Sequence, residues 1–435
     1  MYKSVWLRYI LIGACILLFV PVFIETLNYL STNGSTDLKC RAIASRVQAA
    51  GKDPYFYKWT PADGEYFLDP NDNPRIDVNG NVVTPAMLWL LLPIHALHFK
   101  TTQLLFFAIQ YLAMAGVFLF FFLNYKRSAI LPFAIVFISL ICSNIWVMHV
   151  ERGQVYILYA LFFTICWWLY TQQATRYIFL SGFLAGLTIF FRPFALVLGA
   201  GFVLSWKKHW IYGMITGVLF GLLIFVAPKP STWQQYLTAM TTYQHLQMNS
   251  GANVANPVFN EIPKVVEGKS NYNIATEFQV HSFTGINHYA TRFHFPYTPA
   301  ISMLVYGLTC LSLTALFLWK QRRSPFSINQ LFLFGLLLYF LTEYIIITPR
   351  SAYNAIQWIF PAFLIIQSRL TDTKLVILTT LSLLLLNGAI LNHSRIAGLG
   401  EPMLLVILCY ATFTREPLNP NAKWEKPQSI LPAQS

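Results

Sequence analysis

Residues 103–128, "QLLFFAIQYLAMAGVFLFFFLNYKRS", decide the fold class of this chain. The run carries no charged side chain before Lys126 and Arg127. About 20 apolar residues suffice for a helix to cross roughly 30 Å of hydrocarbon, and basic residues after such a run favour the cytoplasmic side. The stretch therefore predicts a transmembrane helix that enters the cytoplasm at Lys126.

The same pattern recurs along all 435 residues, of which 56% are hydrophobic and 11% are charged. Because an average soluble domain has about 25% charged residues, we expect an all-α polytopic membrane protein. The first apolar run, from Val5, lacks a small-residue cleavage site and is interpreted as an anchor. About twelve spans are predicted, near residues 6–25, 102–125, 130–148, 154–171, 177–190, 193–206, 210–227, 298–319, 327–346, 353–369, 374–391 and 401–414.

Charge sets the expected orientation of these spans. With the N- and C-termini in the cytoplasm, most short cytoplasmic connections are basic and most acids lie outside. The net charge of +13 then reflects topology, and no basic block with interleaved aromatics indicates a nucleic-acid partner. We expect one membrane domain over residues 1–414, in contact with the lipid bilayer, and a disordered cytoplasmic tail over 415–435.

Two long outer loops, about 26–101 and 228–297, are expected to form a cap with juxtamembrane helices. In the first loop, a helix is predicted from Asp37 to Ala50, ending at the Gly and Pro of "AGKDPY". The apolar piece "TPAMLWLLLPIHAL" is too short to span and begins a second helix at Pro85. At 100° per residue, one face of the first helix is polar and the other apolar, which predicts an amphipathic helix at the membrane surface. The polar face contains Asp37, Arg41, Ser45 and Gln48.

Asp37 has two interpretations. Near a helix start, with Ser35 and Thr36, a short acid can cap free amides and meet the positive end of the helix dipole. Alternatively, it is a general base that takes a proton from an attacking hydroxyl at the membrane surface. The residues of this stretch alone do not decide between them.

Three blocks in order carry a family resemblance: "TDLKCRAIASRVQAAGKDPY" from residue 36, "ERGQVYILYALFF" from 151, and "LSGFLAGLTIFFRPFALVLGAGFVLSWKK" from 180. Over roughly residues 5–227 the chain resembles the GT-C membrane glycosyltransferases of bacteria, specifically glycosyltransferase family 87. It differs from that pattern at "VVTP", residues 82–85, and at "TPRSAYNAIQWIFP", residues 348–361.

The resemblance implies a GT-C-like fold and an inverting transferase in the bacterial cytoplasmic membrane. Its donor would be a polyprenyl-phosphate sugar, with mannose or another hexose or pentose. Its acceptor would be a glycan or glycolipid on the outer face. Asp37 takes the place of the family's catalytic Asp, and Arg41, one turn later, is a candidate substrate-binding residue.

Other charged residues at the outer surface are further candidates. Arg192, at the tip of a hairpin, either reaches the outer headgroups or holds the donor phosphate, whose negative charge grows as the glycosidic bond breaks. Glu151 and Arg152 either have a structural role, or Glu151 is a second acid or a metal ligand. Gln154 can bind a sugar hydroxyl, and Gly153 permits close backbone approach.

The remaining candidates lie later in the chain. Glu343, Arg350 and Tyr353 are predicted at the outer ends of two adjacent spans, where Glu343 and Arg350 form an ion pair or Arg350 binds phosphate. His288 lies in an aromatic loop that covers the site and positions donor or acceptor. The spacing of His281, His288 and His294 is a weak metal pattern, so no metal site and no cofactor are proposed, although a divalent metal stays possible.

Two other functions compete with the transferase. A polysaccharide polymerase or ligase acting on lipid-linked glycans also has large outer loops and arginines that bind lipid diphosphates, but it needs no acid in the first loop. A lipid-sugar transporter or flippase would show two similar halves with charges near the midplane. The sequence has no visible internal repeat, which argues against transport.

Overall fold

The computed structural model describes residues 2–33, 35–69, 78–79, 83–124, 130–252, 285–286, 290, 295–346, 352–386 and 394–414. Every regular element in these ranges is a helix, so the predicted all-α class is confirmed. The principal helices are α1 (Tyr2–Asn33), α2 (Thr36–Ala49), α3 (Pro85–Leu91), α4 (Phe99–Asn124), α5 (Ile130–Ile141), α6 (Asn144–Glu151), α7 (Tyr156–Thr171), α8 (Thr175–Phe191), η5 (Pro193–Gly199), α9 (Ala200–Leu204), α10 (Lys208–Gly221), α11 (Pro230–Ala252), α15 (Pro299–Arg323), α16 (Ile328–Ile345), η7 (Ala352–Trp358), α17 (Ile359–Ser368), α18 (Thr373–Leu386) and α19 (Ser394–Phe413).

Five helices of the described chain are long and apolar enough to cross a membrane by themselves, as expected of a multi-pass membrane protein. They are Tyr9–Asn28, Phe99–Phe121, Lys208–Val226, Pro299–Arg323 and Ile328–Ile345. The helices Leu131–Ile141 and Ile145–Glu151, bent by 56°, would make a sixth span if they act as one. The other predicted spans coincide with shorter apolar helices, so their helical character is confirmed, and the number of twelve crossings stays a prediction.

Glycines bring α8 and α10 into backbone contact. A Cβ placed on Gly182 of α8 would lie 2.0 Å from the carbonyl oxygen of Trp210, and a Cβ on Gly213 of α10 would lie 2.0 Å from that of Phe179. Gly186 and Gly217, one turn further along each helix, make the same kind of contact. Small residues at this spacing let membrane helices pack closely. The contact between α8 and α10 fixes the end of α8, and Arg192 follows directly after that end.

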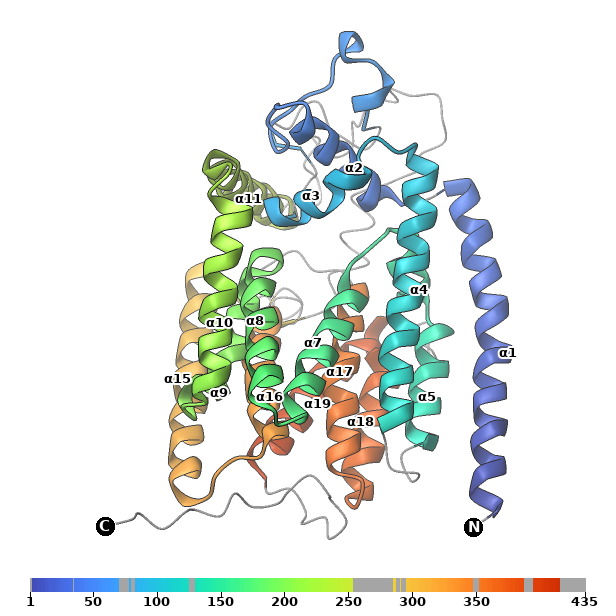
Figure 1. Ribbon diagram of the computed structural model, residues 1–435, viewed down its shortest axis with the longest axis vertical. Coiled ribbons are helices and arrows are strands. Elements are labelled where there is room, and N and C mark those ends of the chain that lie inside the picture. The colour runs from blue at the N-terminus through green and yellow to red at the C-terminus, as the bar shows by residue number, and fades with distance from the viewer. Residues whose placement is uncertain are drawn as a thin grey trace.

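The first long loop forms a cap over one end of the bundle. In Figure 1, α2 and α3 lie across the end away from the first residues of α1. The guanidinium of Arg46 in α2 donates to the carbonyl oxygens of His95 at 3.1 Å, Tyr66 at 3.0 Å and Leu97 at 3.0 Å. One side chain therefore ties α2 to two other parts of this loop.

The helix that carries Asp37 agrees with its predicted bounds within one residue. It ends at Ala49, and Gly51, just beyond the C-cap, has a left-handed φ of 77°. Its environment differs from the prediction. An amphipathic helix at a membrane surface would expose its polar face, whereas Arg41, Ser45 and Gln48 are buried. The Ser45 hydroxyl donates to the Leu88 carbonyl oxygen at 3.3 Å, so α3 covers part of this face. The structure thus corrects the expectation of an exposed polar face, and the position of the helix at a membrane surface stays a prediction.

Candidate active site

The site begins where α2 meets the turn between α6 and α7. The backbone N–H of Leu38, in the first turn of α2, donates to the Arg152 carbonyl oxygen at 3.1 Å. A guanidinium nitrogen of Arg41 donates to the Gly153 carbonyl oxygen at 2.8 Å. Gly153 has a φ of 69°, and a Cβ there would lie 2.5 Å from the Cβ of Leu38. Only glycine fits this turn without displacing α2, as the sequence predicted for a close backbone approach.

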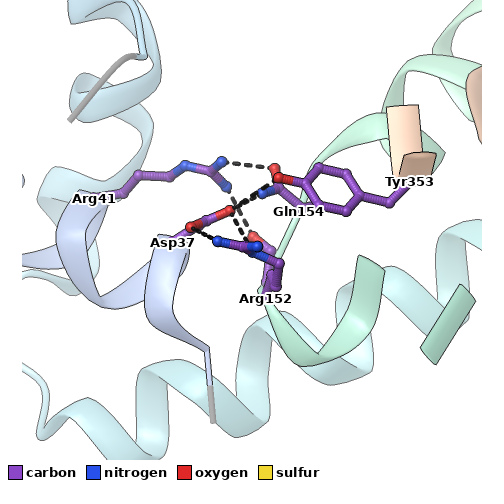
Figure 2. A network of polar contacts seen from close by, with 6 residues as sticks. Asp37, Arg41, Arg152, Gln154 and Tyr353 are labelled. Atoms are coloured by element: carbon purple, nitrogen blue, oxygen red, sulfur yellow. Dashed lines mark hydrogen bonds and ion pairs between the residues drawn. The ribbon is translucent and has the colours of Figure 1, made fainter. Parts of the chain in front are cut away.

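Four donors from two other elements reach the carboxylate of Asp37 (Figure 2). Arg152 donates from Nε to Oδ2 at 3.2 Å and from Nη2 to Oδ1 at 3.3 Å. The Gln154 amide nitrogen and the Tyr353 hydroxyl, at 3.4 Å, also donate to Oδ2. Asp37 is the second residue of α2, after an N-cap at Ser35. It still meets the positive end of the helix dipole, but its side chain binds distant groups instead of capping the helix.

Gln154 connects Asp37 to Arg41. Its side-chain oxygen accepts a hydrogen bond from Arg41 Nη2 at 2.7 Å, while its amide nitrogen donates to Asp37. Arg41 thereby fixes which end of the Gln154 amide faces the acid. A buried arginine, a glutamine and a carboxylate form one connected network, in which each member limits the movement of the next.

A second network surrounds Arg192. Its Nε donates to the Tyr339 hydroxyl at 3.0 Å, and its Nη2 pairs with the Glu343 carboxylate. The guanidinium also lies over the rings of Tyr156 at 5.4 Å and Tyr159 at 5.8 Å. Arg192 is therefore held by protein groups, and its contact with headgroups and its binding of the donor phosphate both stay predictions.

Two tyrosines join the networks. The rings of Tyr156 and Tyr353 lie 6.0 Å apart, and Tyr353 also carries the guanidinium of Arg152 over its ring at 5.6 Å. A continuous path of polar and aromatic contacts therefore runs from Asp37 through Tyr353 and Tyr156 to Arg192. The predicted base and the predicted phosphate ligand belong to one connected site.

Much of α2 is buried, including Leu38, Cys40 and Arg41. Burial, with a smaller effect of Asp69, raises the pKa of the Cys40 thiol well above its ordinary value. Burial also lowers the pKa of Arg46. Charge–charge interactions are stronger in such surroundings than in bulk water. The donors fix the position of the Asp37 carboxylate, and a carboxylate fixed in this way can accept a proton from a neighbouring hydroxyl.

The predicted site residues fall into three groups. Asp37, Arg41, Gln154 and Tyr353 are in one cluster, and Arg192 is joined to it through tyrosines. Glu151 ends α6 directly before Arg152 and is half-buried. His281, His288, His294 and Arg350 lie outside the described residues. The predicted pairing of Glu343 with Arg350 therefore cannot be compared with the structure. Among the described residues, no group of three or more His, Cys, Asp or Glu side chains could hold a metal ion.

Sequence reasoning missed the direct contact of Arg152 with Asp37 and the tyrosines around Arg192. Arg152 was visible as a charge in an outer turn, beside a glycine that allows close approach. The tyrosines at 156 and 159 were visible as a polar-tipped pair near the start of an apolar span. Neither pattern indicates which distant residue it contacts.

Comparison with known proteins adds the family. The model of glycosyltransferase family 87 matches residues 83–342, more than half of the chain. The match includes the turn at Arg152–Gln154 as well as Arg192, and it begins after α2. No curated protein and no solved structure matches the chain.

Proposed function

The chain belongs to glycosyltransferase family 87, and from this premise we propose that it moves a sugar from a polyprenyl-phosphate donor to an acceptor hydroxyl with inversion. The sugar would be mannose or another hexose or pentose, and the acceptor a glycan or glycolipid. A glycosyltransferase family supports an enzyme over the transporter alternative. The observation that carries the proposal is the Asp37 carboxylate, which α2 presents to donors from two distant elements.

We further propose that all twelve predicted helices cross the membrane as one GT-C-like domain over residues 1–414. The cap with α2 would lie on the outer face of a bacterial cytoplasmic membrane. The termini and the 415–435 tail would then be cytoplasmic. Two features support this orientation: α2 and α3 gather at the end of the bundle away from the start of α1, and α15 ends in Lys320, Arg322 and Arg323, as expected of a cytoplasmic helix end.

The reaction would proceed in one displacement. The acceptor oxygen attacks the anomeric carbon, and its proton passes to a carboxylate oxygen of Asp37. The bond between the anomeric carbon and the phosphate oxygen breaks, and its electron pair stays on that oxygen. The donor phosphodiester carries one negative charge and the departing prenyl phosphate carries up to two. The site must therefore stabilise charge that grows on the phosphate.

The remaining residues would orient the reactants. Gln154 and Tyr353 hold Asp37 and are close enough to it to contact the attacking hydroxyl. Arg41 keeps the Gln154 amide in the required orientation. Glu151, His288 and Arg350 stay as proposed contacts of donor or acceptor. No cofactor is part of the proposal.

The test is transfer from polyprenyl-phosphate sugars by purified protein, comparing wild type with Asp37→Asn. Loss of a general base should reduce turnover by roughly 10² to 10⁴. Asp63→Asn is a matched control, because Asp63 also lies in the first loop and pairs with a cation, Lys52, at 2.7 Å. A folded Asp37→Asn protein that turns over like Asp63→Asn would refute the role of Asp37.

A further inference from the structure

Three arginines contribute to the two networks described above, and two of them are paired with an acid by a salt bridge. Arg152 pairs with Asp37, and Arg192 pairs with Glu343. In the described part of the chain, the hydrogen bonds of Arg41 go to neutral oxygens of Gly153 and Gln154. Buried charges are normally compensated by an opposite charge. A phosphate-bearing ligand would bring an anionic group to this cluster of arginines.

Arg192 is poorly placed to release its partner. Glu343 has a side chain that is 4% exposed, so its carboxylate would stay buried without a cation if Arg192 moved. Breaking a buried pair in this way is strongly unfavourable. Arg192 would also give up the Tyr339 hydroxyl, which itself donates to the Gln357 side-chain oxygen at 2.9 Å. These contacts fix Arg192 as part of the wall of the site.

The pair of Arg152 and Asp37 is different. The two arginines are both partly exposed, Arg152 at 14% and Arg192 at 23%, but the acids differ: the side chain of Asp37 is 26% exposed and that of Glu343 is 4% exposed. If the guanidinium of Arg152 moved away, Asp37 would keep its hydrogen bonds from Gln154 and Tyr353. Water could also solvate the freed carboxylate. Exchange of partners therefore costs less at Arg152 than at Arg192.

The proposed reaction moves one negative charge from Asp37 to the phosphate. Asp37 begins ionised and ends protonated, while the phosphate gains the charge of the broken bond. We propose that Arg152 binds the donor phosphate and exchanges the Asp37 carboxylate for it as transfer proceeds. A guanidinium forms strong paired hydrogen bonds with carboxylate and phosphate alike. Because Arg152 leaves the Asp37 carboxylate only for a phosphate, the carboxylate becomes available to the acceptor hydroxyl only when the donor is bound. This inference rests on the proposed lipid-phosphate donor.

The experiment measures equilibrium binding of farnesyl phosphate, a prenyl monophosphate, to the purified full chain in detergent. If Asp37 and the phosphate compete for Arg152, Asp37→Asn should tighten binding about tenfold, a change of ~1.4 kcal/mol. Arg152→Gln should weaken binding at least tenfold, and Arg152→Lys should restore part of it. In the Asp37→Asn and Arg152→Gln double variant, the tightening should disappear, because the two changes act on one interaction.

The matched comparison is Glu343→Gln, which releases Arg192 instead. Under the proposal, a folded Glu343→Gln protein tightens binding of farnesyl phosphate less than Asp37→Asn does, because it adds positive charge without releasing Arg152, and Asp63→Asn binds like wild type. Tightening by Glu343→Gln that equals or exceeds that of Asp37→Asn, with loss of binding in Arg192→Gln, would assign the phosphate to Arg192 and overturn the proposal. Loss of binding in Arg350→Gln with no effect of Asp37→Asn would overturn it in favour of Arg350.

The double variant of Asp37→Asn and Arg152→Gln tests the exchange even if the Glu343→Gln protein does not fold. Failure of the inference is also distinct from failure of the proposed function. Wild type that binds farnesyl phosphate and transfers sugar, with no effect of Asp37→Asn on binding, refutes only the exchange by Arg152. Wild type that neither binds prenyl phosphate nor uses prenyl-phosphate sugars refutes the donor class, and the inference with it.

Discussion

Replacement of Gly153 by alanine tests whether the close approach of α2 to its receiving turn positions Asp37. A non-glycine residue at a φ of 69° costs roughly 1–2 kcal/mol. The new Cβ would also lie 2.5 Å from the Cβ of Leu38, whereas ordinary contact begins at 3.4 Å. Relief of this overlap requires α2 to move by about 1 Å, and a displacement of that size can reduce catalysis about 10²-fold. We therefore expect Gly153→Ala to lose about 10² in turnover.

Gly51→Ala supplies the matched control. Gly51 has a φ of 77°, similar to that of Gly153, and nothing lies within 4 Å of the position of its Cβ. It therefore carries the backbone strain without the overlap, and should lower the midpoint of thermal unfolding slightly while leaving turnover unchanged. Both variants are assayed for sugar transfer and for thermal unfolding in the same detergent. Equal turnover of Gly153→Ala and Gly51→Ala would show that the position of α2 does not depend on this contact.

Three further substitutions probe the fold and the site. Gly182→Leu should lower the free energy of unfolding by at least about 1–3 kcal/mol in a thermal-unfolding assay, since its Cβ would meet the backbone of α10. The control is Gly307→Leu, which should unfold like wild type because nothing lies within 4 Å of the position of its Cβ. Arg46→Ala removes three hydrogen bonds to carbonyl oxygens and should lower the free energy of unfolding of this loop by about 1–3 kcal/mol. The loss is measured as faster proteolysis near Tyr66, and a cleavage rate equal to wild type would contradict this role. Tyr353→Phe removes one hydroxyl from Asp37 and should reduce turnover roughly fivefold, about 1 kcal/mol, with the KM for donor unchanged; a larger change in KM than in turnover would point to direct donor binding.

The elements were largely predictable because local patterns encode them. Apolar runs predicted the long helices, and Gly51 with Pro54 predicted the end of α2. Pro85 predicted the start of α3. Positions along one helix, such as Asp37 and Arg41, also follow from the 3.6-residue period. Each of these features depends on residues that are near one another in sequence.

The contacts of the site were less predictable because they join distant segments. Asp37 and Arg152 are 115 residues apart, and Asp37 and Tyr353 are 316 apart. No periodicity within α2 indicates that its polar face is covered by a turn of another helix pair. Arg192 is a similar case: its pairing with Glu343, 151 residues away, is not visible in either local stretch.

The way in which α2 is held explains how Arg152 can serve two partners. The position of the helix depends on backbone carbonyls: that of Arg152 accepts from Leu38, and that of Gly153 accepts from Arg41. The charge of Asp37 is met by the side chain of Arg152. Because position and charge depend on different atoms of the same turn, the guanidinium can leave the carboxylate while α2 stays docked. A base fixed only through its salt bridge would lose its position whenever the arginine moved to a phosphate.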